Sequence, residues 1–201
     1  MKPRIFAPTV LLLMSALGAA VQSFPAHAES AQSVASEMTW AEYSALGEPH
    51  EMLARRVGTW DIEVKSWEAP GVPPVESEGV SNNKLILGGR FLLQETTHTV
   101  HGMQFQVVSI MGFDNLNEKF EGVWMNNSGT GMSFLEGSAG YAESGVTSTT
   151  GKIHLHQPGN LVTARNVQRF VDENALVTEM YLQDEEGNEW KRLEMVFTRA
   201  N

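Results

Sequence analysis

A strict two-residue alternation runs through the segment from Val57 to Lys65 and constrains the fold more than any other feature of the chain. One face of this segment carries Trp60, Ile62 and Val64, and the other carries Asp61, Glu63 and Lys65. An extended chain places every second side chain on the same side. The segment is therefore predicted to be a strand with one buried and one solvated face, in a barrel or a sandwich.

Strand-like runs separated by turn residues continue from there to the C-terminus. Gly88 and Gly89 separate two such runs and predict a two-residue hairpin, because glycine adopts positive φ without strain. Residues 138–156 are predicted to form one hairpin. The remaining runs are residues 75–87, 90–100, 104–113, 119–126, 132–137, 161–171, 176–183 and 189–198. About ten short strands without helical crossovers predict an all-β fold for residues 49–201, an antiparallel up-and-down barrel whose closure removes its edges.

Two short helices are predicted ahead of the first strand. Residues 39–42 (Thr-Trp-Ala-Glu) have the pattern of a capping box, in which Thr39 accepts from a first-turn amide and Glu42 reaches back. Pro49 is suited to open a second helix that runs through Arg56. Met52 and Leu53 give this second helix an apolar side, which is expected to lie across one end of the barrel.

The first residues have the layout of a secretory signal. A positively charged start precedes an apolar run from Val10 to Val21, and residues 26–28 (Ala-His-Ala) form a small-residue cleavage site. The apolar run has only about twelve residues, whereas a membrane-spanning helix needs about 20. We therefore expect residues 1–28 to be a cleaved signal peptide, residues 29–48 to be a flexible leader with a short helix, and the mature chain to be periplasmic or secreted without membrane insertion.

Composition excludes several classes of site. The 201-residue chain contains no cysteine, which excludes disulfides, zinc thiolates and thiol nucleophiles. Its formal net charge of −10 disfavours nucleic acid as a partner. The P-loop, the dinucleotide fingerprint and the Gly-x-Ser-x-Gly elbow are all absent from the sequence. The sequence assigns no catalytic residue, and nothing in it points positively to an enzyme.

Aromatic residues and methionines recur along the predicted strands and are candidates for the lining of an apolar ligand cavity. Arg90 or Arg165 is suited to orient a polar end of such a ligand, and Lys191 is a further candidate if its face lines the interior. The predicted lining comprises Phe91, Phe105, Trp124, Met180 and Met195. The same side chains are equally suited to a filled core in a structural or interaction barrel, although about ten strands favour a cavity.

Histidines offer an alternative, a haem or metal site. His154 and His156 lie two apart in a predicted strand, which places both rings on one face at a spacing suited to a metal ion. His98 and His101 form a looser pair around a turn. No third ligand lies nearby in the sequence, so neither a metal nor another cofactor is assigned.

Several motifs together resemble the DUF1579 family, a family of unknown function often found in exported bacterial proteins. They are His50-x-x-Leu53, Gly58-Thr59-Trp60-Asp61, Leu87-Gly88-Gly89-Arg90-Phe91-Leu92, Gly112-Phe113-Asp114, Trp124 and Arg199. The Gly58-x-Trp60 element also resembles the first strand of lipocalins, fatty-acid-binding proteins and haem-binding nitrobindins. This resemblance implies a calycin-like barrel in which Trp60 plugs one end and does not touch the ligand.

Overall fold

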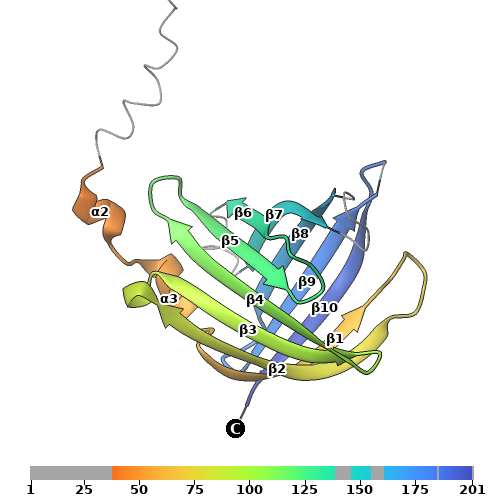
Figure 1. Cartoon of the computed structure of the whole chain (residues 1–201). Coiled ribbons are helices and arrows are strands. Elements are labelled where there is room, and N and C mark those ends of the chain that lie inside the picture. The colour runs from red at the N-terminus through yellow and green to blue at the C-terminus, as the bar shows by residue number, and fades with distance from the viewer. Residues whose placement is uncertain (1–37, 139–145, 155–160, 185, 201) are drawn as a thin grey trace, which may run out of the picture. The chain divides into compact units, whose positions relative to one another are not determined.

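The computed structural model of the chain describes residues 38–138, 146–154, 161–184 and 186–200. The strands form one closed barrel in which each strand pairs antiparallel with its neighbours in sequence, and the first pairs with the last. This arrangement confirms the predicted antiparallel up-and-down barrel (Figure 1). The strands are β1 (Gly58–Ser66), β2 (Val75–Ile86), β3 (Phe91–Val100), β4 (Met103–Asp114), β5 (Lys119–Asn126), β6 (Ser133–Ser138), β7 (Val146–His154), β8 (Leu161–Phe170), β9 (Ala175–Gln183) and β10 (Glu189–Arg199).

The inner face of the barrel follows from the register of these pairs. Directly opposed residues share a face, so the buried residues of β1 identify the inward residues of every other strand. Ile62, for example, is opposite Gly79 on β2 and Phe197 on β10. The alternation predicted for β1 is present, because Trp60 and Val64 are buried with Ile62 while Asp61 and Glu63 are exposed.

Two short helices precede β1, as predicted. Helix α2 (Trp40–Ser44) begins with the expected capping box, in which the Glu42 backbone N–H donates to Thr39 Oγ1 and the Thr39 backbone N–H donates to Glu42. Helix α3 (Glu48–Ala54) is slightly shorter than predicted and contacts β2, β3 and β4 (Figure 1). Leu53 of α3 is fully buried in a cluster with Leu92 and Phe120, so α3 covers this end of the barrel.

The connections between strands depart from the sequence prediction in two places. The hairpin between β2 and β3 exists, but Ile86 pairs with Phe91, so its loop has four residues and includes a short 3-10 turn, η1 (Leu87–Gly89). Gly88 and Gly89 both have positive φ, as the turn requires. Residues 138–156 were predicted as one hairpin, but their described part is the end of β6 at Ser138 and the single strand β7, and the rest of the range lies outside the described residues.

The described residues lie in the compact unit Met38–Asn201, whereas the predicted signal peptide and most of the predicted leader belong to the unit Met1–Glu37, outside the described residues. Within the described part of the chain, no helix is long and apolar enough to span a membrane.

Candidate ligand-binding site

Both buried and partly accessible inward side chains occur toward each end of the barrel interior. Near α3 the inward residues Trp60, Leu92 and Phe120 are fully buried. Toward the opposite end, inward residues such as Phe105 and Met180 keep part of their surface accessible. Toward that end Ile153, Ala164 and Leu182 are nevertheless buried. Helix α3 covers one end of the barrel, which we call the closed end, and we call the end that no described helix covers the open end. The barrel interior between the two ends is called the lumen.

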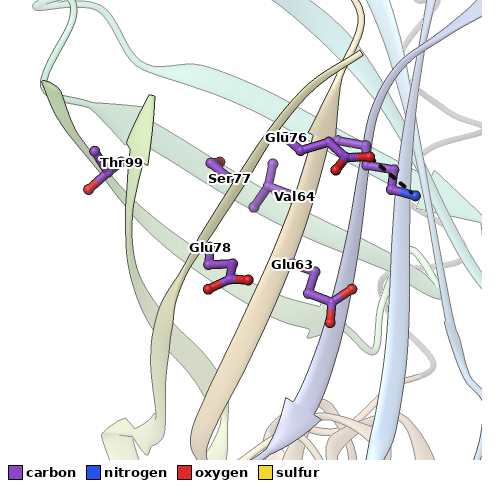
Figure 2. A pocket seen from close by; sticks show the side chains of 7 residues that line it. Glu63, Val64, Glu76, Ser77, Glu78 and Thr99 are labelled. Carbon is purple, nitrogen blue, oxygen red and sulfur yellow. Dashed lines mark ion pairs between the residues drawn. The ribbon is translucent and has the colours of Figure 1, made fainter. Parts of the chain in front are cut away.

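A hollow of about 450 Å³ lies beside the open end, at β1, β2 and the end of β3 (Figure 2). Its lining is mostly charged and polar, and one ion pair joins Lys65 to Glu76 at 3.7 Å. The lining residues are Glu63, Val64, Lys65, Glu76, Ser77, Glu78 and Thr99. With three carboxylates this hollow suits no anionic or apolar ligand, and the lumen is the better candidate for a ligand site.

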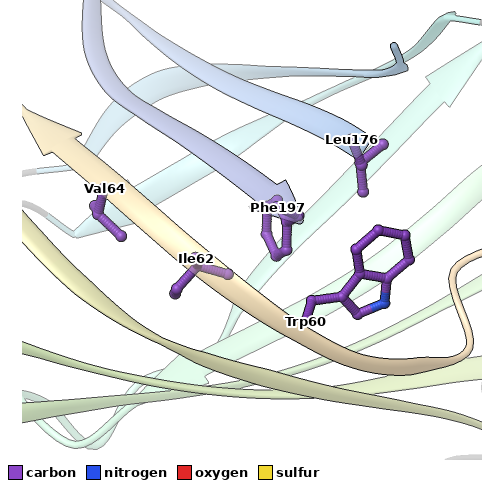
Figure 3. Close-up of a cluster of buried hydrophobic side chains, with 5 residues drawn as sticks. All are labelled: Trp60, Ile62, Val64, Leu176 and Phe197. Atoms are coloured by element: carbon purple, nitrogen blue, oxygen red, sulfur yellow. The ribbon is translucent and has the colours of Figure 1, made fainter. Parts of the chain in front are cut away.

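Trp60 lies at the closed end of the barrel. Its side chain packs with Ile62 and Val64 of β1, Leu176 of β9 and Phe197 of β10 (Figure 3). The indole Nε1 donates a 2.9 Å hydrogen bond to the backbone carbonyl of Arg56. The Arg199 guanidinium lies 4.2 Å from the ring centroid and donates to the carbonyls of Val57 and Arg55, which joins the last strand to the start of the first.

Four of the predicted lining residues face the lumen. Phe105 on β4 and Trp124 on β5 are inward, and each remains partly exposed. Met180 on β9 packs with Trp124 against the buried residues Ile153, Ala164 and Leu182. Met195 on β10 is inward beside the Trp60 cluster. These four side chains provide an apolar wall from the open end toward the closed end.

The other three predicted ligand residues do not face the lumen, and the structure corrects their placement. Arg90 is exposed in the turn before β3, where it donates to the Ser44 carbonyl at 2.9 Å. Phe91 points outward and covers Gly112 of β4. Arg165 lies on the outer face of β8, because the alternation turns Ala164 and Asn166 inward, and it pairs with Glu189 at 2.6 Å.

Lys191 also lies on the outer face of the barrel, and the sequence pattern does not show why. The register of β10 shifts by a bulge between Lys191 and Leu193, so these two residues do not share a face. The Lys191 ammonium donates to the carboxylates of Glu179 and Glu194, the latter at 2.7 Å. Although burial by itself lowers the pKa of Lys191, these hydrogen bonds raise it above the ordinary value.

The candidate histidines are not brought together by the fold. His98 is inward on β3 and buried, with Nδ1 3.0 Å from Ser77 Oγ and its ring edge-on to Phe105. His154 is the last residue of β7 and is exposed. His101 is exposed in a turn, and His156 lies outside the described residues. Within the part of the chain that the structure describes, no three metal-ligating side chains converge.

Polar side chains are grouped on the inner faces of β2 and β3, beside Trp60, and sequence reasoning missed them. On β2 and β3, Ser81 Oγ donates to Asn83 at 3.0 Å and lies 2.9 Å from Thr96 Oγ1, and Gln94 donates to Ser81 at 3.3 Å. Strand β2 carries polar residues on both faces, so its alternation gives no hydrophobic signal. In the sequence, the only sign of these inward polar residues is that β2 has no apolar face.

Arg56, in the segment between α3 and β1, is the second residue that the sequence did not reveal. It is 2% exposed, and its guanidinium reaches across the closed end of the barrel. Nη1 donates to Gln168 Oε1 and lies 3.7 Å from the Met111 sulfur, and Nη2 donates to Thr147 Oγ1 at 3.3 Å. Burial lowers the pKa of Arg56 to about 10, which leaves it charged at neutral pH.

Three buried polar side-chain atoms have no hydrogen-bond partner among the described residues. They are Arg56 Nε, Trp124 Nε1 and Thr178 Oγ1. Trp124 and Thr178 are inward residues of β5 and β9, and Arg56 lies at the closed end of the same interior. Since buried polar groups are normally paired, these three atoms are available for hydrogen bonds to water or to a bound molecule.

A family model for DUF1579, described as a protein of unknown function, matches residues 45–199. No curated protein matches the chain. Rv2717c from M. tuberculosis is a similar crystal structure, with 15% sequence identity and a TM-score of 0.54 over 78% of this chain and 100% of that one. The S-type phycobiliprotein lyase CPES from Guillardia theta is 7% identical, with a TM-score of 0.50 over 82% of this chain and 99% of that one. These similarities confirm the predicted lipocalin-like barrel.

Proposed function

The chain belongs to the DUF1579 family, and we propose from its barrel that it is an exported binding module that holds a small, mostly apolar molecule in the lumen. The observation that carries this proposal is the apolar wall of Phe105, Trp124, Met180 and Met195, which faces inward and is still partly accessible. Aromatic and methionine walls with a few polar groups are typical of small-molecule sites.

The solved structures support a binding role only through the fold. The phycobiliprotein lyase of Guillardia theta has a similar barrel fold. The fold is therefore compatible with a function other than a purely structural one. Export rests on the N-terminal sequence, which predicts cleavage after Ala28. N-terminal sequencing of the protein recovered from its own host tests export directly, because cleavage there makes Glu29 the first residue.

The binding proposal is tested with Nile red, a neutral apolar dye whose fluorescence rises on leaving water. We expect saturable binding to the native protein. Phe105→Ala removes part of the lumen wall and should change the affinity severalfold, whereas Phe134→Ala removes an outward phenyl ring that is 70% exposed and should leave it unchanged. Absence of saturable binding, or an equal effect of the two substitutions, contradicts the proposal and supports a filled barrel.

Native mass spectrometry of the protein purified from its own host, followed by organic extraction, identifies the molecule that is carried. The same preparation distinguishes the haem alternative. Among the candidate histidines, His98 alone is inward and described, so bound haem is expected to give a Soret band that His98→Ala abolishes. An extracted apolar molecule without a Soret band supports the binding module proposed here.

A further inference from the structure

Arg56 carries a buried charge that no carboxylate neutralises among the described residues. Its guanidinium partners are an amide oxygen, a hydroxyl and a thioether, from Gln168, Thr147 and Met111. It belongs to no ion pair in the described part of the chain. A buried charge without a counter-ion is energetically unfavourable. A partner that the folded chain does not supply would therefore stabilise the Arg56 guanidinium in this position.

The barrel interior and the barrel surface differ in charge. The alternation of the strands turns their described carboxylates outward, away from the lumen. These outward residues are Asp61, Glu63, Glu76, Glu78, Glu95, Asp114, Glu121, Glu136, Glu179, Glu189 and Glu194. A chain of net charge −10 therefore has, at the closed end of its lumen, a cation and no facing carboxylate among the described strand residues.

The surroundings of Arg56 form a row of polar side chains across three neighbouring strands. Thr147 of β7 is opposite Gln168 of β8, which is opposite Thr178 of β9. Gln168 faces inward, is only partly buried, and accepts from Arg56 through Oε1. Within the described ranges of the chain, Thr178 Oγ1 and Arg56 Nε have no hydrogen-bond partner. A guanidinium has five N–H donors and no acceptor, and the edge formed by Nε and one Nη can donate to both oxygens of a carboxylate.

We propose that the barrel selects amphiphiles with a terminal carboxylate, whose head group binds Arg56, Gln168 and Thr178 at the closed end. The apolar body then extends along Met195, Met180 and Trp124 toward the open end. This inference rests on the proposed function, because it assigns chemistry and orientation to the ligand of the same lumen.

The test is displacement of Nile red by two ligands of equal length, dodecanoate and its methyl ester. The wild-type protein is expected to bind dodecanoate about tenfold or more tightly, as a charge-assisted hydrogen bond allows. Arg56→Met keeps an apolar side chain of similar length and should bring the two affinities together while ester binding remains. Arg165→Met, which removes an outward arginine paired with Glu189, should leave the preference unchanged.

Thr178→Val provides a second variant that keeps the shape of the side chain if Arg56→Met does not fold, as judged by circular dichroism. It removes one hydroxyl from the row and should reduce the preference for dodecanoate severalfold. Equal binding of the acid and the ester by the wild-type protein overturns the inference and leaves the proposed function standing. An unchanged preference in Arg56→Met or Thr178→Val also overturns it, whereas failure of Nile red to bind at all overturns the proposed function itself.

Discussion

At the residue scale, Arg56 connects the helical segment to the barrel through both its backbone and its side chain. Its carbonyl accepts from Trp60 Nε1 at 2.9 Å and from Asn83 Nδ2 at 3.0 Å, while its guanidinium crosses to β7 and β8. The main-chain contacts fix the residue in place, and they do not depend on the charge of its side chain. The closed end is thus held together by groups other than those that we propose for ligand recognition.

Trp60→Ala is expected to lower the free energy of unfolding by about 3–5 kcal/mol, as for other fully buried large aromatic residues. The substitution removes a side chain that is 0% exposed and also the hydrogen bond to Arg56. Urea denaturation measures the change. Trp40→Ala, at a position that is 78% exposed, is the matched control and should stay within about 0.5 kcal/mol of the wild type. Equal losses in the two variants would place Trp60 outside the core.

The stability of the protein should depend on pH through His98. Burial lowers the pKa of His98 below its ordinary value, so the unfolded chain binds a proton more readily than the folded one. The unfolding free energy should therefore fall as the pH decreases below about 6.5, until the folded-state pKa is reached. Denaturant titrations between pH 5 and 8 measure this slope, with the pH range taken around the ordinary histidine pKa of about 6.5.

His98→Gln should make that slope shallower without removing it. The pKa of His50 is also lowered, by burial first and by the Arg90 charge second, and it contributes with the same sign. His101→Gln, at an exposed turn, is the control and should leave the slope as in the wild type. A slope in His98→Gln equal to that of the wild type would show that His98 titrates equally in the folded and unfolded chains.

At the element scale, the two helices differ in what they bury. Helix α2 contributes no buried residue and is held by exposed contacts, such as Asn115 Nδ2 to the carbonyls of Tyr43 and Ala45. Helix α3 buries Pro49, His50, Met52 and Leu53. The capping box makes α2 easy to predict from sequence. Helix α3 has the weaker local signal, yet it is the helix that covers the end of the barrel.

Removal of residues 1–46 should therefore leave a barrel whose melting temperature is close to that of the chain beginning at Met38. Removal of residues 1–56 takes away α3 and Arg56, uncovers Leu92 and Phe120, and should cause a large loss of stability or aggregation. Differential scanning calorimetry of the three chains provides the comparison. A similar loss from both truncations would mean that α2, and not α3, is the stabilising helix.

Strand β1 was predictable because its two faces differ in polarity, whereas β2 and β10 hid their orientation in different ways. The inward residues Ser77, Ser81 and Asn83 of β2 are as polar as its outward ones, so no alternation is visible. In β10 one extra residue at the bulge reverses the facing of Lys191 relative to Leu193. A bulge of one residue is not visible in the sequence pattern. The side chains on each side of the bulge still alternate, although the face to which they point is exchanged.

At the scale of the whole molecule, the barrel is closed by the pairing of its first and last strands. Trp60 is opposite Arg199 and Ser66 is opposite Leu193, so β1 and β10 are paired along most of their length. The number and antiparallel order of the strands followed from the spacing of turns in the sequence. The site did not: Gln168 and Thr178 are neighbours in the β8–β9 hairpin, but Arg56 comes from the segment before β1 and reaches Gln168 only in the closed barrel.

Val196→Pro tests this closure. Val196 lies between Glu63 of β1 and Val177 of β9, and a closed barrel has no edge strand that tolerates proline. The missing backbone N–H alone should cost about 1–3 kcal/mol of unfolding free energy. Val196→Ala, the control, should cost less than about 1 kcal/mol. A barrel that accepts proline here without loss would behave as an open sheet between β1 and β10.

The β1–β10 seam also sets the order of events when the protein is made. During translation β1 is the first strand to emerge from the ribosome, and its partner β10 is the last. One edge of β1 therefore stays unpaired through nearly the whole of translation. Trp60, Ile62 and Val64 lack Phe197 during that time, and the lumen has no complete wall. The cluster of α3 with β3 and β5 needs only earlier segments, but the barrel itself can close only in one late step, after the final strand of the nascent chain is free.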